Sequence, residues 1–212
     1  MRIAKSATRS VPQPARVRSR RAYFDCKSGQ LHVRTAFPGT GGFDEQTTLI
    51  CLHPTQGSSR VFARLLPLLA ADRSVYAPDL PGHGESDPPA AAGIDASAGA
   101  VVDLAADLRL RQIDLLGLQD GSAVAVALAL AHPELVRALV LLGGAPLERL
   151  ARLQQPCLVL RIGAEAAVHA VPGAARVQVV NAPEYAADLL DAAPQTLATQ
   201  AASFLARVPR AG

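Results

Sequence analysis

The stretch LLGLQDGSA, residues 115–123, decides the fold of this chain. A strand pattern from Ile113 to Leu116 leads into Gly-x-x-x-Gly, and a helix pattern rich in Ala, Val and Leu follows at once. This layout is typical of a nucleophile elbow, a sharp strand-to-helix turn that holds one side chain above a sheet. Glycines flank the turn because it crowds any Cβ atom beside the raised residue. The raised residue here is Gln119, whose carboxamide is neither a useful nucleophile nor a titratable base.

Three further stretches resemble the motifs of the α/β-hydrolase superfamily, in particular its small esterase, C–C hydrolase and haloperoxidase-like branch. LICLHP at residues 49–54 resembles that family's strand and oxyanion turn. APDLPGHGESD at residues 77–87 resembles its D-x-x-G-x-G-x-S-D loop, and AHPELVRALVLL at residues 131–142 resembles the helix end and strand after the elbow. The resemblance covers about half the chain, in family order. It implies an α/β fold with a doubly wound, mostly parallel sheet flanked by helices.

The order of strand and helix patterns agrees with such a sheet of about seven or eight strands. We expect an opening hairpin over residues 23–36 and a helix over residues 58–69 whose cap is the pair Ser58-Ser59. The C-terminal ends of the expected strands bring His53, Asp79 and Gln119 to one edge. Only residues 143–155 separate the strand that ends at Leu142 from Pro156, where family members commonly insert a helical cap. We therefore expect the cap domain to be absent.

Composition divides the chain into a basic start and a mildly acidic remainder. Residues 1–21 hold seven Arg or Lys and no acid, which leaves 14 bases against 18 acids in the rest. We expect residues 1–21 to be a disordered tail and residues 22–212 a single domain, with no nucleic-acid footprint and no membrane span. The three cysteines indicate buried thiols in a reducing compartment rather than a disulfide frame or a metal set. We expect a cytoplasmic protein without cofactor or metal, and leave self-association into a homo-oligomer open.

The catalytic triad that the resemblance implies is substituted at every position. Gln119 stands in the nucleophile position, Ala166 in the position of the orienting acid (with Glu165 one residue off) and Glu184 in that of the histidine. No histidine follows His169. We expect Ser122 to be an early-helix capping hydroxyl rather than a nucleophile, and Asp120 to point away from the pocket.

The other histidines receive structural interpretations. His83 is expected to be a loop residue, His132 to end a helix, His169 to lie on the surface, and His32 to face out of the opening hairpin. Only His53, in the turn that resembles the oxyanion turn, should border the pocket.

Three functional hypotheses follow, in order of preference. The first is a non-hydrolytic ligand-binding or interaction protein, a pseudoenzyme or degenerate paralogue. The second is an enzyme without a covalent intermediate, in which the N–H of Asp120 and the turn after His53 form an oxyanion hole, with His53 or Glu184 as base for proton transfer, elimination or decarboxylation. The third is a weak carboxylic-ester hydrolase. For a small-molecule ligand, the candidate binding residues are His53, Pro54, Thr55, Gln119 and Asp120.

Overall fold

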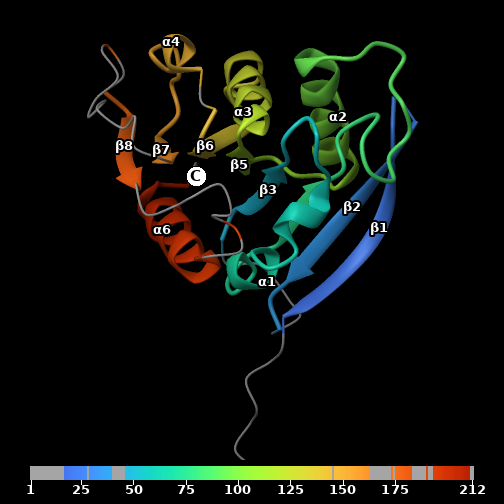
Figure 1. The fold of residues 1–212 in the computed structure, drawn as a ribbon, viewed down its shortest axis with the longest axis horizontal. Helices are drawn as coiled ribbons and strands as arrows, with labels where there is room; N and C mark the ends of the chain where they lie inside the picture. Colours follow the sequence, from blue (N-terminus) through green and yellow to red (C-terminus); the bar gives the residue numbers. More distant parts are fainter. Residues whose placement is uncertain are drawn as a thin grey trace, which may run out of the picture.

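One sheet of eight strands forms the centre of the computed structural model, in the order β1-β2-β4-β3-β5-β6-β7-β8 (Figure 1). The model describes residues 17–27, 29–39, 46–144, 146–162, 173, 175–182, 190 and 193–210. Only β2 pairs antiparallel with its neighbours, and the other pairs are parallel. The strands are β1 Arg18–Cys26, β2 Gly29–Phe37, β3 Thr48–Leu52, β4 Val75–Pro78, β5 Ile113–Leu118, β6 Val136–Leu142, β7 Cys157–Ile162 and β8 Val177–Ala182. This confirms the expected fold class.

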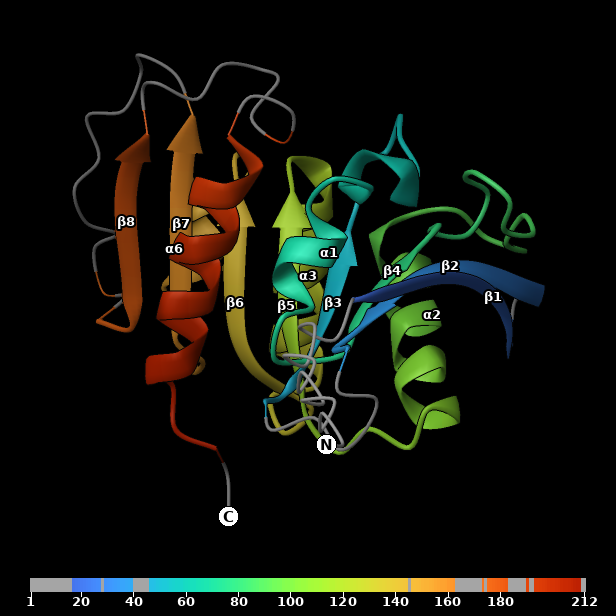
Figure 2. The same ribbon diagram turned by 90° about the horizontal axis from the view of Figure 1, so that it is seen from below.

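Helices cover both faces of the sheet (Figure 2). The described helices are η1 Ser59–Phe62, α1 Leu66–Leu69, α2 Ile94–Asp107, α3 Asp120–Ala131, α4 Leu147–Leu150 and α6 Pro194–Arg207. Apolar side chains of α2 and α3 form one core with one face, and those of η1, α1 and α6 form a second core with the other. Because α/β sheets are buried on both faces, strands such as β3 read as continuous apolar runs. Between β6 and β7 the structure places only the short helix α4, as expected.

The helix expected over residues 58–69 is divided into η1 and α1. Ser58 does cap η1, because its side chain accepts a hydrogen bond from the backbone N–H of Arg60. The division has a local cause at Pro67, which lies in the first turn of α1. Proline lacks a backbone N–H and its ring clashes with the preceding turn, so it is tolerated at the start of a helix and not inside one.

The N-terminal boundary differs from the expectation that residues 1–21 form a tail. β1 begins at Arg18, which pairs with Phe37 of β2, so residues 18–21 belong to the sheet. Their side chains are exposed, because β1 is an edge strand and backbone pairing does not require apolar side chains. Residues 1–16 lie outside the described residues.

A buried ion cluster lies at the end of the sheet opposite the elbow. Arg137 holds the Asp114 carboxylate through Nε at 2.9 Å and Nη2 at 2.5 Å, and Nη1 of Arg73 lies 3.5 Å from the same carboxylate. Burial raises the pKa of Asp114 to about 6, against the opposing effect of these guanidinium groups. Arg137 also donates to the carbonyl of Val208 at 2.6 Å, which ties the residue after α6 to the sheet.

Candidate ligand site at the elbow

The backbone of Gln119 has the strained conformation of an elbow. Its φ is 50° and its ψ is −117°, and it is one of two non-glycine residues with positive φ among those described. Its N–H donates to Leu142 of β6 at 2.8 Å, and its carbonyl accepts from the N–H of Ser122 at 2.8 Å. Its side chain is exposed at the end of β5. The predicted position and strain of Gln119 are therefore confirmed, and such a conformation costs about 1–3 kcal/mol.

Three glycines hold this turn in place by leaving no room for a side chain. A Cβ atom on Gly117 would lie 2.6 Å from Cα of Ser122, and one on Gly121 would overlap the Leu52 carbonyl. The sequence predicted both of these. It did not single out Gly144, where a Cβ atom would lie 2.5 Å from the carbonyl carbon of Gln119. The paired glycines at the end of β6 were the signal for this close approach.

Ser122 is buried beneath the elbow rather than presented on it. Its Oγ lies 3.0 Å from the carbonyl oxygen of Gly117 and 2.9 Å from that of Gly143, and the single hydroxyl proton is shared between these two acceptors. The expectation that it is not the raised residue is confirmed. The expected capping role is wrong, because the hydroxyl instead joins the ends of β5 and β6.

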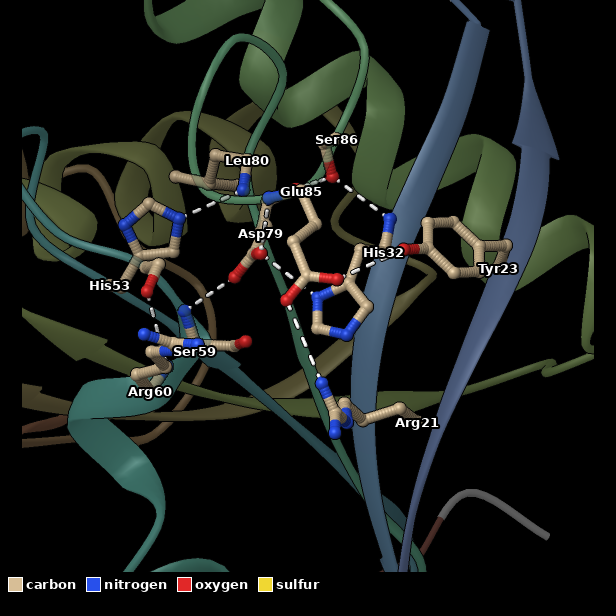
Figure 3. Close-up of polar contacts among 11 residues, drawn as sticks. Arg21, Tyr23, His32, His53, Ser59, Arg60, Asp79, Leu80, Glu85 and Ser86 are labelled. Atoms are coloured by element: carbon tan, nitrogen blue, oxygen red, sulfur yellow. Dashed lines mark hydrogen bonds and ion pairs between the residues drawn. The ribbon is translucent and has the colours of Figure 1, made fainter.

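His53 is held in one neutral tautomer by the backbone around it (Figure 3). The N–H of Leu80 donates to Nε2 at 2.8 Å, so Nε2 is an acceptor, and Nδ1 donates to the carbonyl of Pro54 at 2.7 Å. Burial lowers the pKa of His53 below its ordinary value. The hypothesis that His53 is a general base is therefore corrected, because the lone pair that would accept a proton is already occupied.

A buried carboxylate at Asp79 organises the loop beside the elbow, as Figure 3 shows. Oδ1 accepts from the N–H of Ser59 at 2.6 Å, and Oδ2 accepts from the N–H of Glu85 at 2.9 Å and lies 2.9 Å from Nδ1 of His32. Burial raises the pKa of Asp79, but these hydrogen bonds outweigh it, and the net pKa lies below the ordinary value.

His32 was expected to face outward, and this is wrong, since only 1% of it is exposed. It lies on the face of β2 that η1 covers, and it was missed because its partner is 47 residues away in the chain.

A pocket of about 330 Å³ opens at the C-terminal edge of the sheet, next to the elbow. Apolar side chains such as Leu80, Ile94 and Val124 make most of its lining. Three of the candidate ligand-binding residues contribute to it, namely His53, Thr55 and Asp120, whereas Pro54 and Gln119 are not part of its described lining. Asp120 belongs to this lining, and the expected direction of its side chain, away from the pocket, stays a prediction.

The remaining candidate residues divide between the loops and the part of the chain that is not described. His83 lines the pocket, with Nδ1 3.0 Å from the carbonyl of Pro81 and its ring 5.4 Å from that of His53. His132 follows α3 directly, as expected. The other expected positions, Glu165, Ala166, His169 and Glu184, lie outside the described residues. Among the described residues, no group of three His, Cys, Asp or Glu side chains is arranged to hold a metal ion, and no helix suffices to cross a membrane.

Comparison with known families agrees with this geometry. A family model described as the alpha/beta hydrolase fold matches residues 47–209, most of the chain. The chain belongs to the α/β-hydrolase fold family. The match begins just before β3 and ends just after α6, so it includes the strands and helices that build the elbow and both cores.

Two curated relatives are named as a hydrolase and a deacetylase. The chain is 43% identical over 83 residues to 2-hydroxymuconate semialdehyde hydrolase of Pseudomonas sp. (strain CF600), which covers 38% of this chain and 29% of that protein. It is 39% identical over 119 residues to pyrrolizixenacetamide deacetylase of Xenorhabdus hominickii, which covers 55% of this chain and 43% of that protein. The chain thus spans less than half the length of these relatives.

Solved structures of other proteins share the fold. Naproxen esterase from Bacillus subtilis superposes with a TM-score of 0.74 at 16% identity, covering 89% of this chain and 92% of that chain. A serine hydrolase from Cycloclasticus zankles superposes with a TM-score of 0.75 at 14% identity, covering 88% of this chain and 97% of that chain. At these identities the likeness shows the α/β-hydrolase fold alone.

Proposed function

We propose that this chain is a non-hydrolytic member of the α/β-hydrolase fold, a pseudoenzyme that binds a small, largely apolar molecule in the pocket beside the elbow. The observation that carries the proposal is the conformation of Gln119. The strained backbone raises one side chain at the place where the fold presents a nucleophile, and that side chain is a carboxamide. A carboxamide is neither a useful nucleophile nor a titratable base, so the turn presents no group that could attack an ester.

The neighbouring groups support the same conclusion, because neither is free to replace the nucleophile or its base. The hydroxyl of Ser122 lies beneath the turn and is bound to backbone carbonyls. Both nitrogens of the His53 imidazole form hydrogen bonds with backbone groups, Nδ1 with the carbonyl of Pro54 and Nε2 with the N–H of Leu80. An activated nucleophile requires a base within hydrogen-bond reach, and neither group offers one.

The lining of the pocket indicates the class of ligand. A volume of about 330 Å³ is at the small end of the range for ligand sites, and most of the lining is apolar. The described lining contains no Lys or Arg, so the pocket offers no cationic side chain to hold an anionic ligand. A short neutral ester or alcohol fits these properties.

Binding is tested with methyl hexanoate as the probe, observed by saturation-transfer NMR. Ala96 of α2 lines the pocket, so Ala96→Phe fills the cavity and should abolish saturation transfer. Ala106 lies on the exposed side of the same helix, and Ala106→Phe is the matched control that should leave the signal unchanged. Transfer that survives Ala96→Phe would place the ligand elsewhere and refute this part of the proposal.

The absence of hydrolysis is tested separately with a serine-directed fluorophosphonate probe and with p-nitrophenyl butyrate. The protein should not be labelled, because the elbow carries no hydroxyl, and p-nitrophenyl butyrate should be hydrolysed no faster than in buffer alone. Labelling of the unmodified protein, or turnover that exceeds that of the Gln119→Ala variant, would show that a catalytic group is present after all.

A second candidate is weak carboxylic-ester hydrolysis or proton-transfer chemistry in the same pocket. The retained elbow geometry favours it, because fixed backbone donors alone leave residual catalysis of about 10³-fold to 10⁴-fold over water in known hydrolases. The curated relatives also carry hydrolase names. In this case p-nitrophenyl butyrate would be turned over by the unmodified protein and equally by Gln119→Ala, whereas Ala96→Phe would abolish turnover by excluding the substrate.

A further inference from the structure

A second pocket, of about 230 Å³, lies beside β2 and shares no lining residue with the pocket at the elbow. Its walls come from β2, from η1 with its capping residue, and from the loop after β4. The lining residues are Arg34, Ser58, Arg60, Asp79, Gly84 and Glu85. Asp79 lines this pocket, whereas Leu80, the next residue, lines the first.

Arg34 carries a buried donor that the described residues leave unsatisfied. Its Nε is shielded from solvent and has no hydrogen-bond partner among them. An unsatisfied buried donor costs about 1–3 kcal/mol. Arg34 also stands directly opposite Arg21 in the pairing of β1 with β2, and like charges opposite one another in a sheet are destabilising. This position therefore calls for an acceptor with negative charge.

The two acids of the pocket do not supply that acceptor, because other donors already occupy them. The oxygens of Asp79 accept from Ser59, from Glu85 and from the His32 ring. The carboxylate of Glu85 accepts from the hydroxyl of Tyr23 at 3.0 Å and lies 3.8 Å from Nη1 of Arg21. Figure 3 shows Tyr23 and Arg21 approaching Glu85 from β1.

Two guanidinium groups thus remain for a ligand, those of Arg34 and Arg60. Within the described part of the chain, neither has an acid within ion-pair distance. Arg60 is exposed, and its backbone N–H donates to Oγ of Ser58 at 3.4 Å, which leaves the Ser58 hydroxyl proton free to donate.

We propose that this second pocket binds a small oxyanion, the phosphate or carboxylate group of a metabolite, between Arg34 and Arg60. Guanidinium groups match such anions because their planar N–H donors form paired hydrogen bonds to two oxygens on one centre. The hydroxyl of Ser58 would add a third donor. The bound anion would offset the charge repulsion between Arg34 and Arg21.

The test is calorimetric titration of the full chain with inorganic phosphate and, separately, with succinate, at constant ionic strength in chloride. We expect saturable binding of at least one of the two, and the better one identifies the chemical class of the anion. Arg34→Gln and Arg60→Gln should each weaken binding by about tenfold or more, a loss of about 1.4 kcal/mol. Arg111→Gln, an exposed arginine remote from the pocket, is the matched control and should leave binding unchanged.

Two outcomes would overturn the proposal. One is that neither anion binds saturably up to about 10 mM, which corresponds to less than about 3 kcal/mol of binding free energy. The other is an equal loss in the Arg111→Gln variant, which would mean general attraction to a basic surface. Circular dichroism checks whether the Arg34→Gln variant folds. If it does not fold, anion binding by the Arg60→Gln variant decides the test. Ala96→Phe fills only the first pocket, so unchanged anion binding in that variant separates this proposal from the proposed function.

Discussion

Replacement of Asp79 by Asn should destabilise the protein by about 3 kcal/mol at pH 7. The carboxylate accepts three hydrogen bonds, at 2.6 Å from Ser59, 2.9 Å from Glu85 and 2.9 Å from His32. Hydrogen bonds to a charged group each contribute about 1.5–3 kcal/mol. An Asn side chain keeps only one oxygen, so it loses at least one of these hydrogen bonds and weakens the others because it is uncharged. Its own NH₂ group would also face one of the donors that now bind the carboxylate.

The measurement is urea unfolding followed by circular dichroism, with thermal unfolding in parallel, where this loss corresponds to a decrease of about 6–12 °C in Tm. Asp87→Asn is the matched control, because Asp87 belongs to the same loop, is exposed and accepts one hydrogen bond, from Gln30. It should cost less than about 1 kcal/mol. A similar small cost for Asp79→Asn would refute the view that the buried carboxylate anchors the loop.

The same comparison carries a pH dependence with a definite sign. The pKa of Asp79 is lowered in the folded protein, so the unfolded chain binds its proton first on acidification. The ionised carboxylate contributes fully to the free energy of unfolding above the pKa of Asp79 in the unfolded chain, about 4. This contribution is lost as the pH falls through the lower pKa of Asp79 in the folded protein. The difference in unfolding free energy between the wild type and Asp79→Asn should therefore narrow below about pH 4. A difference that stays constant down to pH 2 would contradict the lowered pKa.

Three further predictions follow from the buried groups and the elbow. Arg137→Met leaves a buried carboxylate without its main partner and should cost about 3–5 kcal/mol in urea unfolding, whereas replacing both partners by apolar residues should cost less. Iodoacetamide at pH 8 should modify Cys26 and neither of the other two cysteines in the native protein. Burial raises the pKa of the Cys51 thiol and raises that of the Cys157 thiol to about 12. Peptide mass spectrometry measures the modification, and rapid alkylation of Cys51 or Cys157 would contradict the prediction. Gln119→Ser should give little or no turnover of p-nitrophenyl butyrate, because an unassisted serine hydroxyl is a weak nucleophile.

The fold and the elbow could be predicted from the sequence because their signals are local. Gly117, Gln119 and Gly121 occupy alternate positions of one turn, and the adjacent strand and helix have clear apolar patterns. The burial of His32 could not be predicted in the same way. Its partner, Asp79, lies in the loop after β4. A single histidine between apolar residues does not indicate which face of its strand other elements will bury.

The state of His53 shows a second limit of the sequence. Its position at the end of β3 was predicted, but its availability as a base depends on two backbone contacts, one of them from Leu80, 27 residues away. The start of β1 was missed for a related reason. Backbone pairing at a sheet edge tolerates charged side chains, so residues 18–21 resemble a tail in composition although they are paired with β2.

The strained turn at Gln119 also bears on how such a protein changes over generations. Its geometry is imposed by glycines at three other positions and by β6, and none of these contacts involves the Gln119 side chain. The raised residue can therefore be exchanged without rebuilding the turn, and loss of a nucleophile leaves the backbone ready to present another. The backbone shape of the site and its reactivity therefore depend on different residues. A few substitutions that include position 119 can remove a catalytic activity, or restore the same or another one, while the turn keeps its shape.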